Sequence, residues 1–238
     1  MTITRNNQQN TRTVANATSA TRASYAPTSG SDRVLIVRAS GLRTTEATFT
    51  LSCTFGGVGM TEAVTAETSS SSRWYRTSIF YLIAPSTSAG DIVVTSSQSL
   101  TGFIIDAVTL LGAAQTSLVG STDTDAVTNS TANTSYTLTG CTSNSLLVAM
   151  VMSTCAGPPT WSWSTATEDY DLAGSADTAE LAGSGGYYET SGGDVTLTAT
   201  RSATVAAQVG CAAEFKAATA GTSTVPVLAH HYAVLMAA

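Results

Sequence analysis

Three apolar runs between residues 74 and 113 set the pattern of this chain. They are Ser78–Ala84, Asp91–Thr95 and Gly102–Leu111, separated by Pro85, a Gly90 turn and a run of serines. Short runs of Ile, Val, Phe and Tyr between Gly, Pro and Ser are typical of β-strands. In the first run the odd and the even positions are both apolar. We therefore expect a strand buried on two sides, as in the middle of a sandwich.

The same pattern predicts strands at Arg33–Ala39, Thr48–Phe55, Thr61–Ala66, Tyr136–Leu138, Ser145–Met152, Asp194–Arg201 and Ala203–Lys216, and a short one from Trp161 to Trp163. No segment combines helical periodicity with capping residues. About ten regularly spaced strands predict an all-β fold, a two-sheet antiparallel sandwich. Seven side chains are expected to be buried between the two sheets: Ile79, Tyr81, Ile83, Val93, Ile104, Val108 and Leu147.

The sandwich domain is expected to span residues 31–216, with an arm on each side. Residues 1–30 show almost no periodicity, and such a segment cannot order itself alone. We expect this N-terminal arm either to lie on a neighbouring subunit or to fold over its own domain. Residues 217–238 form a second arm, which is apolar and needs a cover. Loops are expected at Leu118–Ser135 and in the Gly/Asp/Ala-rich stretch Thr165–Thr190, and a tight turn at residues 56–60.

Composition narrows the possible functions. Hydrophobic residues make up 43% of the 238 residues, enough for a sizeable core, whereas charged residues make up only 11%. About 30 serines and about 40 threonines give a hydroxyl-rich surface. The net charge of -6 argues against a nucleic-acid partner, because nucleic acids bind to basic patches on a protein surface. The N-terminus shows no signal peptide, and no apolar run is long enough to span a membrane, so no membrane partner is expected.

Candidate catalytic and metal chemistry is sparse. The two histidines, His230 and His231, are adjacent in the apolar C-terminal arm, and no nucleophile-elbow motif accompanies them. We interpret them as packing or interface residues. The four cysteines, Cys53, Cys141, Cys155 and Cys211, lack metal-ligand spacing, and we expect buried, reduced thiols. We predict no enzyme, no cofactor and no metal.

Two loops nevertheless offer alternatives. The aromatic residues Trp161, Trp163, Tyr170, Tyr187 and Tyr188 are a possible glycan-binding platform. Glu168, Asp169 and Asp171 lie beside them and are conceivable acid–base pairs of a glycosidase, although an acidic surface loop is the simpler interpretation. Asp123 and Asp125 are conceivable calcium ligands, but the spacing of a calcium loop is absent.

Residues 33–216 resemble a jelly-roll domain of phage virion structural proteins and bacterial surface proteins of unknown function. The resemblance rests on the order GGVGMT, YLIAPSTSAGDIVVTSS and DAVTLLGAAQTS, with Val108, Gly112 and Gln115 in matching places. The strand Leu146–Val151 and the closing pair DVTLTATRSATVAAQVGCAAEF continue it. These motifs describe β architecture and carry no catalytic residue. The resemblance implies a β-sandwich, and both arms fall outside it. In layout the chain is similar to the sandwich domains with extended arms that phages use to decorate or cement shells.

We therefore expect a non-enzymatic virion protein, a phage capsid decoration or cement protein assembled in the host cytoplasm. Its expected partners are copies of itself, as a homo-oligomer, and other virion proteins, the major capsid protein above all. The alternative is a carbohydrate-binding module of a phage tail or cell-surface protein. Interface residues are expected in the C-terminal arm: Val225, Val227, Leu228, His230, His231, Tyr232, Leu235 and Met236.

Overall fold

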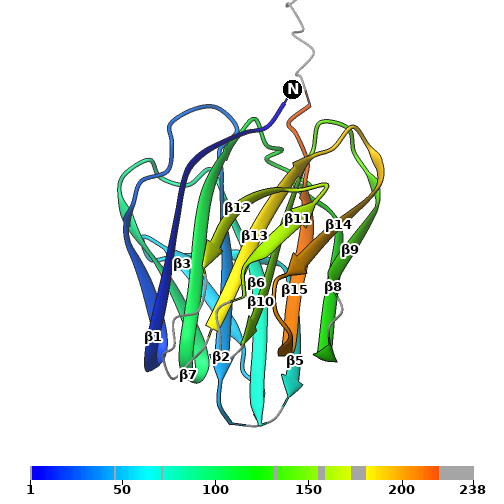
Figure 1. Ribbon diagram of the computed structural model, residues 1–238. Helices are drawn as coiled ribbons and strands as arrows, with labels where there is room; N and C mark the ends of the chain where they lie inside the picture. Colours follow the sequence, from blue (N-terminus) through cyan, green and yellow to red (C-terminus); the bar gives the residue numbers. More distant parts are fainter. Residues whose placement is uncertain are drawn as a thin grey trace, which may run out of the picture.

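The structure is a computed structural model that describes residues 2–45, 47–70, 72–130, 133–154, 159–172 and 181–219. All regular elements in these ranges are strands, and every pairing between them is antiparallel, which confirms the predicted all-β sandwich fold (Figure 1). The strands are β1 (Thr4–Tyr25), β2 (Val34–Arg43), β3 (Leu51–Phe55), β4 (Val58–Gly59), β5 (Thr61–Ser70), β6 (Arg73–Ile83), β7 (Gly90–Leu111), β8 (Val119–Ser130), β9 (Thr134–Cys141), β10 (Leu146–Thr154), β11 (Trp161–Ser164), β12 (Thr167–Leu172), β13 (Leu181–Glu189), β14 (Gly193–Arg201) and β15 (Val205–Phe215).

The N-terminal segment is a strand of the domain. Strand β1 pairs with β7 along nearly its whole length, from Thr4 opposite Leu111 to Tyr25 opposite Gly90 (Figure 1). The expectation of an arm on a neighbouring subunit is therefore wrong for residues 4–25, and the alternative, folding onto its own domain, is correct. The polar sequence misled because β1 is an edge strand that draws its order from main-chain hydrogen bonds to β7, which an apolar period does not report.

Strands β1 and β7 fold back on themselves and so contribute to two layers. Tyr25 pairs with Gly90, yet its hydroxyl lies 2.9 Å from Oγ1 of Thr109. In a straight strand, Gly90 and Thr109 would lie roughly 60 Å apart. The bend coincides with the register shifts between Val14 and Ser19. Residues 4–14 of β1 therefore join a five-stranded layer with β7, β2, β6 and β5, and residues 19–25 join a second layer with the first part of β7, β3 and β4.

The second half of the chain repeats this arrangement. Strands β8, β15, β10, β13 and β12 form a five-stranded layer in the order in which β1, β7, β2, β6 and β5 stand in the first half. Strands β9, β14 and β11 form the second layer of this half. Strand β9 stands where residues 19–25 of β1 stand in the first half, β14 where the first part of β7 stands, and β11 where β3 stands. The chain is thus two sandwiches of one topology, which we call the first sandwich (residues 4–111) and the second sandwich (residues 119–215).

Matching irregularities support this internal duplication. In the first sandwich, Ser24 has a positive φ of 54°, and its N–H donates to Oδ1 of Asp91 at 2.9 Å. In the second, Gly140 has a positive φ of 62°, and its N–H donates to Oδ1 of Asp194 at 2.8 Å. Asp91 and Asp194 each follow the glycine with which their strand, β7 or β14, begins. The β1–β7 pairing and the β9–β14 pairing each have a register shift at this point. Such a β-bulge is a specific feature, so its recurrence at the same place indicates a shared plan.

The sandwiches pack through their five-stranded layers. Equivalent faces meet, since Ile36 of β2 and Val148 of β10 both belong to the shared core. The strand order runs in opposite directions across the contact: β5 lies against β8 and β15, and Arg5 of β1 contacts Asp169 of β12. The two sandwiches are therefore related by an approximate two-fold axis, as in a symmetric dimer whose subunits are joined in one chain.

Buried apolar side chains form one core between the sandwiches, one within the first sandwich and two clusters within the second. Ile79, Ile104 and Val108 are buried as predicted, in the core between the sandwiches. Leu147 is also buried, but inside the second sandwich. Tyr81, Ile83 and Val93 are less buried than these four and are half-buried. Tyr81 and Ile83 lie toward the end of β6, where they pack on the rim of the shared core.

Two stretches expected to be loops contain strands. The polar stretch 118–135 contains β8, and the Gly-rich stretch 165–190 contains β12 and β13. Strand β8 is an edge strand whose outward positions are polar. Two glycines of β13, Gly183 and Gly185, lie where side chains of the first sandwich approach closely. The expected tight turn at residues 56–60 is confirmed, because β3 pairs with β4 across Gly56 and Gly57.

Candidate functional site

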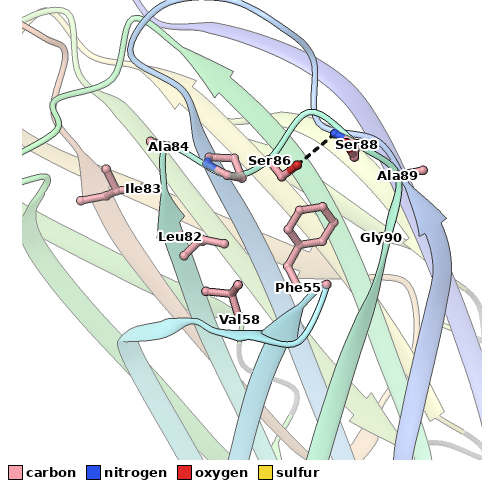
Figure 2. A pocket seen from close by; sticks show the side chains of 11 residues that line it. Phe55, Val58, Leu82, Ile83, Ala84, Ser86, Ser88, Ala89 and Gly90 are labelled. Atoms are coloured by element: carbon pink, nitrogen blue, oxygen red, sulfur yellow. Dashed lines mark hydrogen bonds between the residues drawn. The ribbon is translucent and has the colours of Figure 1, made fainter.

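An apolar cleft opens at one end of the first sandwich, between the β3–β4 turn and the β6–β7 loop (Figure 2). Its volume is about 330 Å³. Phe55, Val58, Leu82, Ile83 and Pro85 give it its apolar walls, and the other residues that line it are Gly, Ala and Ser, so none is charged. Because its lining carries no charge, the cleft suits aliphatic groups better than a charged ligand.

Val58 makes this cleft distinct from the rest of the described surface. Its exposed fraction is 56%, and it is the exposed large hydrophobic side chain among the described residues. It follows Gly56 and Gly57, whose φ angles of 54° and 81° allow the sharp turn that presents it. A lone exposed valine is ordinary, but this one stands at the mouth of an uncharged cleft, which makes the cleft a candidate contact surface.

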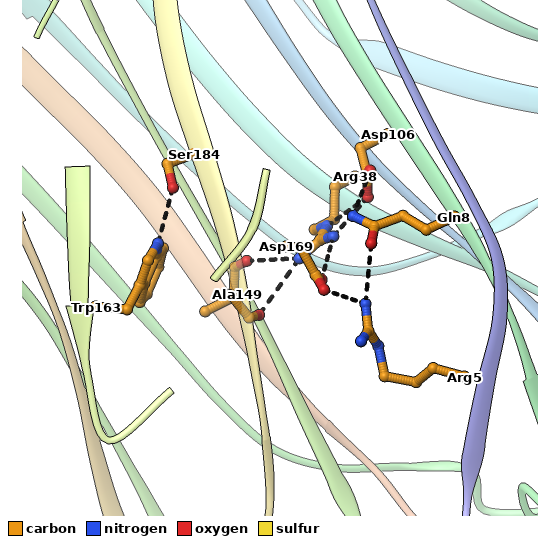
Figure 3. Close-up of polar contacts among 9 residues, drawn as sticks. Arg5, Gln8, Arg38, Asp106, Ala149, Trp163, Asp169 and Ser184 are labelled. Atoms are coloured by element: carbon orange, nitrogen blue, oxygen red, sulfur yellow. Dashed lines mark hydrogen bonds and ion pairs between the residues drawn. The ribbon is translucent and has the colours of Figure 1, made fainter. Parts of the chain in front are cut away.

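A second notable group of side chains is a buried ion network between the sandwiches (Figure 3). Arg38 of β2 donates from Nε and Nη2 to Oδ2 of Asp106, at 2.8 and 2.6 Å, and from Nη2 to Oδ2 of Asp169 at 2.6 Å. Its Nη1 donates to the carbonyl oxygens of Ala149 and Gly186 in the second sandwich. Arg38 and Asp106 are fully buried.

The N-terminal strand completes the network. Arg5 pairs with Oδ1 of Asp169 and stacks over the ring of Tyr187, with 3.5 Å from its guanidinium carbon to the ring centre. Gln8 donates from Nε2 to Oδ1 of Asp106 at 3.1 Å. Two arginines thus face two aspartates, so the buried charges balance.

The network connects the two sandwiches, because Arg38 of the first donates to groups of the second. Burial lowers the pKa of Arg38, but the carboxylates of Asp106 and Asp169 outweigh it and raise that pKa, so the guanidinium stays charged. Burial raises the pKa of Asp106, and Arg38 opposes this shift. Arg38, Asp106 and Asp169 are buried between the two sandwiches, and Arg5 is the member of the network with a partly exposed side chain.

The structure does not bring the five candidate glycan-binding aromatics together. Trp161 and Tyr170 are buried, with exposed fractions of 5% and 6%. Trp163 is half-buried, donates from Nε1 to Oγ of Ser184 at 2.8 Å and stacks on Tyr136 in the second sandwich. Tyr187 packs toward the shared core, whereas Tyr188 points into the core of the second sandwich. These rings fill cores on both faces of one sheet, so they form no common platform.

The acidic residues beside them are also dispersed. They lie on strand β12 rather than in a surface loop. Asp169 belongs to the ion network, and Asp171 accepts the N–H of Trp161 at 2.9 Å. Burial raises the pKa of Glu168, and Asp171 adds to the shift. Because two of the three carboxylates hold other parts of the fold, they do not form the facing pair that glycoside hydrolysis needs.

Asp123 and Asp125 also have structural partners. Asp123 accepts the N–H of Thr137 at 2.6 Å, and Asp125 accepts the N–H of Ser135 at 2.9 Å. They therefore attach β8 to β9 across the two layers of the second sandwich. Within the described ranges, no three His, Cys, Asp or Glu side chains gather into a possible metal site.

The cysteine prediction is confirmed where the structure describes it. Cys53, Cys141 and Cys211 are buried, free thiols. Burial raises the pKa of Cys53 and of Cys211 to about 12, which keeps these thiols protonated and unreactive. Cys155 lies outside the described residues.

The expected interface residues of the C-terminal arm, from Val225 to Met236 and including His230 and His231, also lie outside the described residues. Ala217 forms an isolated bridge with Ala113, and the N–H of Ala218 donates to the carbonyl of Gly112 at 2.8 Å. No helix in the described part of the chain has the length and apolar character to cross a membrane.

Comparisons with known proteins leave the resemblance untested. Neither the protein-family models nor the curated proteins give a match to this chain. The likeness to virion jelly-roll domains therefore stays a prediction. Sequence reasoning also missed the apolar cleft, for which the available signals were the valine inside the glycine turn and Pro85 at the end of an apolar strand.

Proposed function

We propose that this chain is a non-enzymatic structural protein of a virion, a phage protein that decorates or cements a capsid shell. The observation that supports this most is how the fold uses its carboxylates. Asp91, Asp123, Asp125, Asp194 and Glu214 accept main-chain N–H groups, and Asp106 and Asp169 hold arginines. Groups that elsewhere transfer protons are committed here to holding strands together.

The surface suits association without chemistry. Ser and Thr side chains cover much of it, and only 11% of all residues are charged. Burying uncharged surface avoids the cost of desolvating ions, so contacts of moderate area are enough to hold a subunit in place. The partners we propose are copies of this chain and other virion proteins, with the major capsid protein foremost, in a particle assembled in the host cytoplasm.

The C-terminal segment is the proposed means of attachment. Residues 220–238 contain no Asp, Glu, Lys or Arg, and Val225, Val227 and Leu228 open their apolar part. The N-terminal segment forms β1 and is part of the first sandwich. The C-terminal segment is therefore the candidate for reaching a neighbouring molecule. Ordering such a segment costs about 1–2 kcal/mol per residue, which an apolar contact on a shell can offset.

The test is the composition of purified particles. Particles should be produced from the genome that encodes this chain, with the wild-type sequence or with Val225, Val227 and Leu228 replaced by Ser. We expect the wild-type chain at a fixed ratio to the major capsid protein by quantitative mass spectrometry, and on the particle in cryo-electron microscopy maps. The Ser variant should fold but be depleted from particles.

A matched control replaces Thr222, Ser223 and Thr224 by Ala, which changes the same segment without removing apolar side chains. This control should be incorporated normally. A wild-type chain that stays in the host lysate and is absent from particles would refute the proposed function.

A further inference from the structure

The apolar cleft and the last described residues of the chain, Ala217 to Thr219, lie at the same end of the molecule. The main chain of Ala218 bonds to Gly112, and the N–H of Gly112 donates to the carbonyl of Ser31 at 3.3 Å. Two residues on, Arg33 donates from Nη2 to the carbonyl of Pro85 at 3.3 Å, and Pro85 lines the cleft. A short series of contacts thus joins the last described residues of the chain to the wall of the cleft.

The segment is long enough to reach the cleft. Val225 stands six residues beyond Thr219 and Leu228 nine, which corresponds to a reach of roughly 20–30 Å for an extended chain. A tethered segment of this length has an effective concentration in the millimolar range, far above that of a second molecule in dilute solution. Its own chain is therefore the favoured donor.

The chemistry of the two surfaces also matches. The cleft has no charged residue in its lining, and residues 220–238 contain no Asp, Glu, Lys or Arg. Contact between them buries apolar surface on both sides without desolvating an ion. Val58, exposed at the mouth, gains a neighbour.

We propose that in the free protein the cleft holds the C-terminal segment of the same chain, with Val225, Val227 and Leu228 as its anchors. The contact covers an apolar segment that would otherwise promote aggregation. It concerns the free molecule and therefore goes beyond the proposed attachment to a shell. If the protein decorates a particle, the same segment leaves the cleft when it attaches.

Disulfide trapping in the full-length chain tests the contact. Val58→Cys combined with Val227→Cys should form a disulfide within one molecule under mild oxidation at low micromolar protein, located by mass spectrometry of peptides. Ser191→Cys with Val227→Cys is the matched control, because Ser191 is exposed in a loop of the second sandwich outside the cleft. The Val227→Cys single variant controls for reaction with the native thiols.

Three outcomes are distinguishable. An intramolecular disulfide in the Val58 pair well above the control supports the proposal. A disulfide between two molecules overturns it and assigns the cleft to a second copy. Equal trapping in both pairs, or trapping in neither, overturns it as well.

Hydrogen exchange gives a second measurement that needs no oxidation. Val58→Asp places a charge at the mouth of the cleft on an exposed position, so the fold should be retained. The amides of Val225, Val227 and Leu228 should then exchange about tenfold faster, the factor that corresponds to about 1.4 kcal/mol. Thr61→Asp, exposed on β5 outside the cleft, should leave their exchange unchanged. Equal exchange in both variants overturns the proposal, and neither result depends on whether the chain enters a virion.

Discussion

The two sandwiches share a strand order but fill equivalent positions with different side chains. On the face between the sandwiches, Arg38 pairs in register with Asp106 in the first, whereas Met150 pairs with Cys211 at the same place in the second. At the cleft, Ile83 pairs with Val34, and its counterpart opposite Leu146 is Glu189. Among the residues that the structure describes, the buried guanidinium and the apolar cleft thus belong to the first sandwich alone.

What the sandwiches keep in common is main-chain geometry. Asp32 and Asn144 each stand two residues before an equivalent strand, β2 or β10, with φ angles of 52° and 63°. Asp and Asn tolerate this left-handed conformation better than most residues. Turn conformations and strand register therefore define this topology, while equivalent buried positions accept an ion pair in one sandwich and Met with Cys in the other.

The largest expected effect comes from making the first sandwich resemble the second at the shared face. Arg38→Met leaves Asp106 buried without its cation. Removing one partner of a buried ion pair costs about 3–5 kcal/mol, and we expect that loss in the free energy of unfolding measured with urea. Gly185, whose missing Cβ leaves room for the guanidinium of Arg38, makes the site specific for this side chain.

The double variant Arg38→Met with Asp106→Cys sharpens the test. It reproduces the Met150–Cys211 pair and removes both charges, so it should be more stable than Arg38→Met alone. Additive losses from the two substitutions would contradict the view that the pair acts as one unit.

The next effect concerns acid sensitivity in the second sandwich. Glu214 accepts the N–H of Thr142 at 2.6 Å and that of Ser121 at 3.0 Å. Burial raises its pKa, but these N–H groups outweigh burial and hold the pKa below the usual 4.5. A lowered pKa in the folded state gives stability that is present above pH 4.5 and is lost as the pH falls through the lowered value.

We therefore expect Glu214→Gln to lower the free energy of unfolding by about 1.5–3 kcal/mol at neutral pH, as for hydrogen bonds to a charged group. Below pH 4.5 the wild type loses this contribution and the variant has none to lose, so the free energies of unfolding of the two proteins should approach each other. Chemical unfolding at several pH values measures both. The counterpart in the first sandwich is the neutral Thr109, so Thr109→Val should leave the pH dependence unchanged. A parallel pH profile for Glu214→Gln and the wild type would contradict this account.

The sequence predicted the strands that are apolar and short, and missed those that are not. Arg33–Ala39 and Ser145–Met152 were recognised as β2 and β10 because consecutive Val, Leu and Ile allow little else. Strands β1 and β8 were missed because their polar side chains face solvent at the edges of sheets. Such strands are specified by the partner's main chain, which no local pattern reveals.

Neither the internal duplication nor the candidate site could be predicted from the sequence, because both depend on how distant segments meet in the fold. In the first sandwich, β1 and β7 each supply two layers, whereas β8–β9 and β14–β15 do so in the second, so the repeats differ in apparent strand number. Asp106 lay in a recognised strand, but only the tertiary fold places it opposite Arg38 and near Asp169. The cleft likewise needs two distant turns to meet.

A smaller effect is expected at two tyrosines that each span one sandwich. The hydroxyl of Tyr25 lies 2.9 Å from Oγ1 of Thr109, and that of Tyr136 donates to the carbonyl of Met150 at 2.8 Å. Burial raises the pKa of Tyr25 to about 12, so its hydroxyl stays protonated. Tyr25→Phe and Tyr136→Phe should each cost about 0.5–1.5 kcal/mol in thermal or urea unfolding. A loss confined to one of them would show that the two layers are not joined alike.

The smallest effect exchanges residues between the two equivalent bulges. Ser24 and Gly140 both have positive φ, a conformation that costs a residue with a Cβ more than it costs glycine. No atom lies within 4 Å of a Cβ added to Gly140, so backbone strain alone decides the result there. We expect Gly140→Ser to destabilise by about 0.5–1 kcal/mol and Ser24→Gly to be neutral or slightly stabilising, measured as shifts in the urea midpoint. If both exchanges destabilise equally, the Ser24 side chain contributes to the first bulge in a way that the second lacks, and the two bulges are not equivalent in energy.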